Sequence, residues 1–95
     1  MPKRLTNAEV AARLENIPRW KVARGKLRRT FKFPDFVTAF GFMTRAALVA
    51  EKMNHHPEWL NVYGTVRVDL STHDAGGISS ADFTLARRMD ELAGE

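Results

Sequence analysis

The first third of the chain has apolar and polar positions spaced for one helix and one hairpin. Thr6 and Glu9 have the spacing of a capping box, and apolar residues follow at helical intervals, so we expect a helix over residues 6–16. Residues 20–23 and 27–33 are predicted to be strands joined by a short turn at Arg24-Gly25. The second strand has one apolar and one solvated face, as in many antiparallel sheets. Its apolar face holds Leu27, Phe31 and Phe33 with Arg29 among them, and its polar face holds Lys26, Arg28, Thr30 and Lys32.

A long apolar pattern then predicts a helix from Pro34 or Asp35 to about Asn54. Steps of three and four residues define a core stripe of Phe36, Phe40, Met43, Ala47 and Ala50. Further apolar residues widen this arc beyond what one small sheet needs to cover; they are Phe42, Val49 and Met53. Either the helix is unusually buried or this second stripe meets another subunit, and we favour a homodimer or homotetramer.

The last third predicts a second hairpin and a final helix. Residues 59–63 and 65–71 are expected to be strands on either side of Gly64, and Ser79 with Asp82 forms a second capping box. The helix that follows has an apolar face of Phe83, Ala86, Met89 and Leu92. The order α-β-β-α-β-β-α predicts an α+β fold, a four-stranded antiparallel sheet with helices packed on one face. We expect a single domain over residues 1–95.

Composition narrows the classes of protein. The chain has 95 residues, a formal net charge of +4 and no cysteine, which excludes disulfides and cysteine-based metal sites. No apolar run approaches the roughly 20 residues of a membrane span, and the amino terminus lacks the apolar core of a signal peptide. We therefore expect a cytoplasmic protein without a membrane partner.

Positive charge is concentrated at one end of the sequence. Residues 1–32 contain ten Lys and Arg against two Glu, whereas residues 33–95 contain five against nine acidic residues. This surplus is either a solvated basic face or an electrostatic footprint for an anion or nucleic acid. Because no aromatic-rich RNA-binding signature accompanies it, we do not expect a nucleic-acid partner.

The three histidines are the candidate chemistry. His55 and His56 precede Pro57 at a helix-to-strand corner, and His73 lies at the exit of a strand. They could cap backbone groups, form a three-imidazole metal site, or act as metal-free acids and bases. Adjacent histidines rarely reach one ion together, which weighs against the metal site. For acid–base catalysis, Glu51 and Asp82 are candidate carboxylates to orient the rings.

The spacing of Glu51, His55-His56-Pro57, Tyr63, His73 and Asp82 resembles the signature of the pterin-4a-carbinolamine dehydratases. The flanking segments NHHPEW and LSTHDAGG are similar to the family as well, and the resemblance covers about residues 1–93. It implies removal of water from a 4a-hydroxytetrahydropterin to give the quinonoid dihydropterin, in pterin recycling for an aromatic amino acid hydroxylase. The pterin is then the substrate, and neither a metal nor another cofactor is implied.

The resemblance also implies roles for individual residues. His55 and His73 resemble the acid–base pair, His56 a histidine that binds and orients the pterin, and Glu51 and Asp82 supporting carboxylates. The backbone around Pro57 and from Thr72 through His73 and Asp74 to Ala75 resembles the cradle of the ring. Trp59 either lines the pterin or belongs to the core, and Asp82 can also serve as a helix cap. The alternative function is a non-catalytic binding or transcriptional-coactivator module on the same fold.

Overall fold

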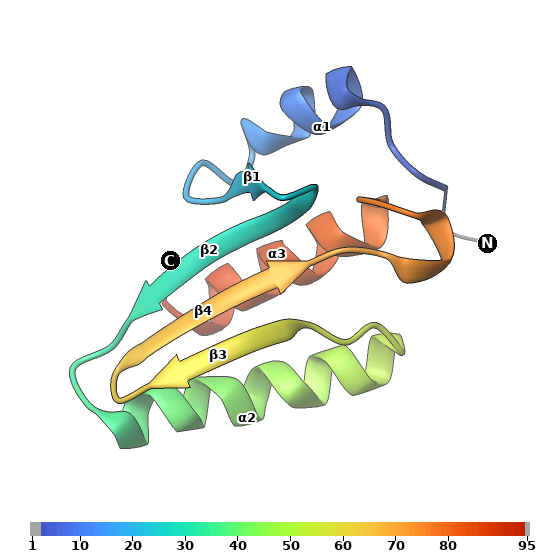
Figure 1. Ribbon diagram of the computed structural model, residues 1–95. Helices are drawn as coiled ribbons and strands as arrows, with labels where there is room; N and C mark the ends of the chain where they lie inside the picture. Colours follow the sequence, from blue (N-terminus) through green and yellow to red (C-terminus); the bar gives the residue numbers. More distant parts are fainter. Residues whose placement is uncertain (1–2, 95) are drawn as a thin grey trace.

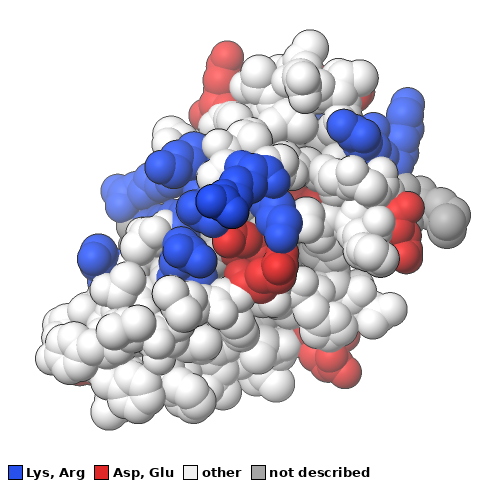
Figure 2. Space-filling view, in the orientation of Figure 1, with Lys and Arg blue, Asp and Glu red and all other residues white. Residues whose placement is uncertain are grey.

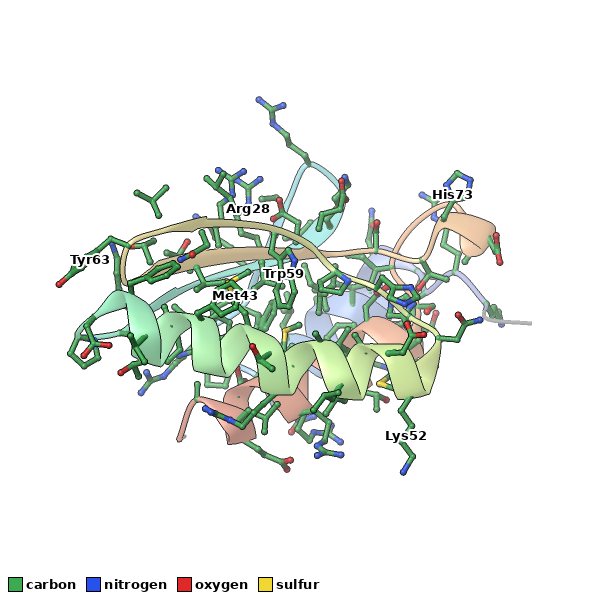
Figure 3. All side chains as sticks on the ribbon, turned by 90° about the horizontal axis from the view of Figure 1, so that it is seen from below. Arg28, Met43, Lys52, Trp59, Tyr63 and His73 are labelled. Atoms are coloured by element: carbon green, nitrogen blue, oxygen red, sulfur yellow. The ribbon has the colours of Figure 1, made fainter. Side chains whose placement is uncertain are left out.

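A four-stranded antiparallel sheet with helices on one face forms the molecule (Figure 1), as the computed structural model shows for residues 3–94. The helices are α1 (Asn7–Leu14), α2 (Phe36–Met53) and α3 (Ser80–Leu92). The strands are β1 (Lys21–Ala23), β2 (Lys26–Lys32), β3 (Glu58–Val62) and β4 (Thr65–Leu70), in the sheet order β1-β2-β4-β3, and a 3-10 turn, η1 (His73–Ala75), follows β4. Both α2 and α3 lie against the same face, and the opposite face is open (Figure 3). The predicted α+β fold and its element order are confirmed.

Local signals in the sequence set the ends of these elements. Thr6 caps α1 in a capping box with Glu9, and Ser79 caps α3 in a capping box with Asp82. At the first hairpin Arg24 and Gly25 both have positive φ, 55° and 76°, which suits the two-residue turns whose twist matches the strands.

The core lies between the sheet and the two long helices. Arg29, the one basic residue on the apolar face of β2, is buried there. Its guanidinium lies 2.5 Å from a carboxylate oxygen of Asp90 on α3 and 4.0 Å from the ring centre of Phe31. Asp90 also accepts a 2.8 Å hydrogen bond from the indole N–H of Trp20. These partners offset the desolvation of the buried charge.

Our prediction of which α2 residues are buried is partly wrong. Phe36 and Phe40 are 48% and 53% exposed, whereas Phe42, which we had placed on a subunit-facing stripe, is 0% exposed. Ala50, which we had placed on the core stripe, is fully buried as predicted, and the other fully buried positions of α2 are Ala39 and Ala46, which we had not placed there. Small alanines allow the helix to approach the sheet and α3 closely, so the large rings at its start lie at the margin. None of the described helices is long and apolar enough to cross a membrane.

Candidate active site

Two corners of the chain carry the three histidines to one end of the sheet. The helix α2 ends at Asn54, which adopts a left-handed conformation with φ 52°, and the N–H of His55 still donates to the carbonyl of Ala50. At the exit of β4, Thr72 and Gly77 exchange two backbone hydrogen bonds of 2.8 and 3.3 Å. This closed loop contains η1 and therefore holds His73 on a well-defined turn.

A polar cleft of about 370 Å³ lies where these corners meet. His56 comes from the α2–β3 corner and His73 from η1. The strands contribute Lys26, Glu58 and Asp69, and Ser71 directly follows β4. His73 projects from the open side of the sheet (Figure 3). Because its lining is almost entirely of hydrogen-bonding side chains, the cleft suits a small, polar, hydrogen-bonding molecule.

Next to the cleft, His55 is hydrogen-bonded to a buried carboxylate. Its Nε2 lies 2.5 Å from Oδ1 of Asp82, which is 0% exposed. The other carboxylate oxygen accepts from the hydroxyl of Thr72 and from the backbone N–H of Ser79, both at 2.9 Å. The Thr72 and Ser79 hydroxyl oxygens are 2.6 Å apart. Asp82 thus makes both contacts that the sequence had left open: its carboxylate closes the capping box of α3 and is hydrogen-bonded to the ring of His55.

His56 has a carboxylate partner too, but in solvent. Its Nε2 lies 2.7 Å from Oε1 of Glu51, and the two side chains are 58% and 80% exposed. An exposed pair of this kind fixes a ring less firmly than a buried one. His56 is therefore the more adaptable of the two adjacent imidazoles.

Charged pairs form the strand side of the cleft. Arg28 donates to both carboxylate oxygens of Asp69, at 2.6 and 3.1 Å. These hydrogen bonds hold the pKa of the Asp69 carboxyl below its ordinary value and raise that of the Arg28 guanidinium. Lys26 lies 2.5 Å from Glu58. Near neutral pH the Asp69 carboxylate is therefore ionised and hydrogen-bonded to Arg28.

Several predicted site residues lie outside the cleft lining. Trp59 points from β3 to the helix side of the sheet, near Met43 (Figure 3), and packs against the core as the core interpretation predicts. Thr72 is buried and its hydroxyl donates to Asp82. It therefore contacts a residue beside the cleft and does not line the cleft itself. Within residues 3–94, no three His, Asp or Glu side chains are grouped to hold a metal ion.

The sequence had not indicated four of the lining residues, namely Lys26, Glu58, Asp69 and Ser71. The signal for them was strand alternation, since Lys26, Glu58 and Asp69 belong to the solvated face of the sheet and Ser71 continues the alternation of β4 by one residue. Their approach to the histidines required the order β2-β4-β3, which the element pattern alone did not specify.

Comparison with known proteins identifies the family. The sequence profile described as Pterin 4 alpha carbinolamine dehydratase matches residues 3–92. The chain belongs to the pterin-4-alpha-carbinolamine dehydratase family. Relatives provisionally named pterin-4-alpha-carbinolamine dehydratase include a protein of Solibacter usitatus, 55% identical over 98% of both chains. Another, from Bradyrhizobium diazoefficiens, is 57% identical over 98% of this chain and 95% of its own.

Solved structures agree with this membership. The crystal structure of a transcriptional coactivator/pterin dehydratase from Brucella melitensis superposes with a TM-score of 0.93 at 47% identity, covering 97% of this chain and all of that one. A pterin dehydratase-like protein described as a RuBisCO assembly factor shares the fold alone, with a TM-score of 0.67 at 23% identity over 81% of this chain and 89% of its own.

Proposed function

We propose that this member of the family eliminates water from a 4a-hydroxytetrahydropterin, producing the quinonoid dihydropterin for reuse by an aromatic amino acid hydroxylase. The observation that carries the proposal is the polar cleft between His56 and His73, beside the His55–Asp82 pair. The relatives' names support a dehydratase in general.

The reaction requires one acid and one base. The C4a–O bond breaks as the departing hydroxyl takes up a proton and leaves as water. The ring nitrogen N5 loses its proton, and its electron pair forms the new N5=C4a double bond. One proton is supplied and one is removed, so the histidines return to their starting states after the protons equilibrate with water.

The carboxylate partners of His55 and His56 support different roles for these two rings. The second oxygen of Asp82 accepts from Thr72 and Ser79, and an Oδ1 that accepts from His55 favours the His55 tautomer with a proton on Nε2. The Nδ1 atom of a neutral His55 is then unprotonated and basic. We assign His55 and His73 as the acid–base pair and His56, with Glu51, as the residue that orients the pterin.

The backbone cradle implied by the family has fewer available donors than its length suggests. The N–H groups of Thr72 and Ala75 already donate within the turn, to the carbonyls of Gly77 and Thr72. We propose that the pterin ring is held instead by the remaining polar groups around His73, Asp74 and Pro57.

Self-association is part of the proposal. Exposed apolar residues gather where α2 begins and β3 ends, and we call them the apolar end patch: Phe36, Val37, Phe40, Leu60, Val62 and Tyr63. The Tyr63 hydroxyl lies 3.4 Å from the carbonyl of Pro34, and the rings of Phe36 and Phe40 are 5.6 Å apart, which joins the two elements. This corner is mostly free of charged side chains in Figure 2, at the lower left. A second copy of the chain is the proposed partner.

A coactivator or other binding module on this fold is the competing function. It has no evident use for three histidines of which two already have carboxylate partners. The test is dehydration of synthetic 4a-hydroxytetrahydropterin, followed by absorbance. His55→Ala and His73→Ala should each lower kcat by about 10²–10⁴-fold, compressed by the spontaneous reaction, whereas His56→Ala should act mainly through KM. If all three variants fold by circular dichroism and keep wild-type constants, the proposed site is wrong.

A further inference from the structure

Part of the basic first third of the sequence reaches the cleft, although the sequence order keeps it far from the histidines. The pairing of β2 with β4 brings Lys26 into the same lining as His56 and His73. Arg28 holds Asp69, which belongs to that lining as well, and Arg28 and His73 project from the same open side of the sheet (Figure 3). Nothing in the dehydration chemistry uses these cations.

The open face carries more positive than negative charge around this point. Figure 2 shows Lys and Arg side chains gathered over the sheet around a smaller acidic area. In the described strands the solvated face holds the cations Lys21, Lys26, Arg28, Lys32 and Arg67 and the carboxylates Glu58 and Asp69. Lys21 and Arg28 are register partners, so two like charges oppose each other across β1 and β2. Because Arg28 is already paired with Asp69, Lys21 adds positive charge to this side of the sheet that the Arg28–Asp69 pair does not neutralise.

Lys26 is placed to exchange its partner. Its ammonium contacts Glu58 across the cleft lining, and the two side chains are 36% and 63% exposed. An ion pair this exposed contributes little to stability, so a bound anion could replace or join Glu58 at small cost. Arg28 differs, because both of its contacts to Asp69 form a bidentate pair.

We propose that Lys26 and Lys21 hold a negatively charged substituent, a phosphate or a carboxylate, on the pterin whose ring lies between His56 and His73. The inference rests on the proposed function and names a class of substrate for the same cleft. With the ring beside the histidines, a substituent that extends along the sheet meets Lys26 first and then the Lys21–Arg28 pair. Ammonium groups bind either anion through charge-assisted hydrogen bonds.

A polynucleotide fits this face less well than a small anion. Glu58 and Asp69 stand among the cations, and the outward residues of β3 next to them include Leu60 and Val62. A nucleic-acid track would need continuous positive charge with aromatic rings on which bases stack. The positive charge here is instead local, beside a cleft the size of a small ligand.

Binding of three probes tests the proposal: 6-hydroxymethyl-7,8-dihydropterin, its phosphate ester, and the corresponding 6-carboxy compound, each titrated calorimetrically at low and high salt. The anionic probes should bind about tenfold more tightly than the alcohol at low salt, and the difference should shrink as salt rises. The anionic probe that binds more tightly shows whether the charged substituent is a phosphate or a carboxylate. Equal affinity for all three probes overturns the proposal.

Four single variants, two of them controls, locate the effect. Lys26→Gln and Lys21→Gln should each lower the ratio of anionic-probe affinity to alcohol affinity by about threefold or more. Lys32→Gln is the matched control, because Lys32 lies on the same face about 20 Å further along β2 and bonds to Thr65. Lys52→Gln removes a charge from the helix side (Figure 3). If either control variant loses as much preference for the anionic probes as Lys26→Gln does, the preference comes from the overall positive charge of the protein and the proposal is wrong.

The neutral probe separates the two hypotheses. If the alcohol binds and 4a-hydroxytetrahydropterin is dehydrated without any preference for charge, the inference fails and the proposed function stands. If no pterin binds and none is dehydrated, the proposed function fails and the inference with it. Displacement of the phosphate ester by a single-stranded oligonucleotide at about 0.15 M salt would identify a nucleic-acid site and also overturn the proposal.

Discussion

His55 and Asp82, 27 residues apart in sequence, are joined by a 2.5 Å hydrogen bond between Nε2 and Oδ1. His55 belongs to the corner after α2, and Asp82 to the first turn of α3. The contact connects the two helices at the end of the sheet where the cleft opens. Because Asp82 is fully buried, its charge must be satisfied by named partners, and His55 is one of them.

Replacing Asp82 by Asn should damage catalysis and stability together. An amide cannot accept from His55, Thr72 and Ser79 as a carboxylate does, so the His55 tautomer is no longer fixed. We expect kcat to fall by about 10–100-fold, the effect typical of a residue that orients an imidazole. The free energy of unfolding should fall by about 1–3 kcal/mol. Steady-state kinetics and denaturant unfolding measure the two effects, and Glu51→Gln, at the exposed pair, should change both less.

Thr72 should act as a positioning residue through its hydroxyl. Thr72→Val keeps the shape of the side chain but removes the donor to Asp82 and the contact with Ser79. We expect a loss of about 1–3 kcal/mol in the free energy of unfolding and a lower kcat with little change in KM. Thr72→Ser keeps the hydroxyl and should recover most of the kcat. A kcat equal to wild type in a folded Thr72→Val variant would show that the hydroxyl serves stability alone.

Local chemistry explains why so much of the fold could be predicted. The two capping boxes, the Arg24-Gly25 turn and the alternation in β2 each depend on residues within a few positions of one another. These local signals can be read from one sequence because the tertiary structure agrees with them.

Long-range packing explains what could not be predicted. The core stripe of α2 was right at Met43 and Ala50 and wrong at its start, because Phe36 and Phe42 are equally apolar and only the close approach of the sheet and α3 decides which one is buried. The cleft lining was incomplete for a similar reason, since Lys26 approaches His73 through the strand order. Phe42→Glu would therefore disrupt the core and not an interface between subunits.

Self-association should depend on the apolar end patch. Val37 and Phe40 are 79% and 53% exposed on α2, so Val37→Glu plus Phe40→Glu should leave the fold intact. If a second copy covers this patch, the double variant should sediment as a smaller species, because buried glutamates carry a large desolvation cost. Leu48→Glu is the matched control, an exposed apolar residue elsewhere on the same helix. An unchanged mass for the double variant, with a wild-type circular dichroism spectrum, would exclude this patch as the interface.

Gly64 and Gly41 should respond oppositely to the same change. A Cβ at Gly64 would lie 2.3 Å from the carbonyl oxygen of Phe33, whose N–H donates to the Gly64 carbonyl. Gly64→Ala must therefore displace backbone, and we expect it to destabilise by about 1–3 kcal/mol. At Gly41, inside α2, the nearest atom is the flexible end of Arg45 at 3.4 Å, so Gly41→Ala should stabilise by up to about 1 kcal/mol. Thermal unfolding of both variants tests the pair.

The Arg28–Asp69 pair predicts how stability depends on pH. Hydrogen bonds from Arg28 lower the folded-state pKa of Asp69 from its ordinary value of 3.8, so the unfolded chain takes up a proton at that carboxyl first. The contribution of the pair is therefore present above about pH 4 and is lost as the pH falls through the folded-state pKa. Denaturant unfolding of wild type, Arg28→Gln, Asp69→Asn and the double variant gives the coupling energy between the two side chains.

This coupling should be favourable at pH 7 and should be smaller at pH 3, below the ordinary pKa of the Asp69 carboxyl. The control is the same cycle on Lys26 and Glu58, where exposure of both side chains predicts a small coupling at either pH. Arg28 and Asp69 are the less exposed pair, at 25% and 13%, so salt should screen their coupling less. A coupling that is the same at pH 7 and pH 3 would mean that Asp69 stays ionised throughout or that the contact adds nothing to folding. In that case, the cycle is repeated at higher salt. The coupling energy weakens if Asp69 stays ionised and in contact with Arg28, and it is unchanged if the contact adds nothing to folding.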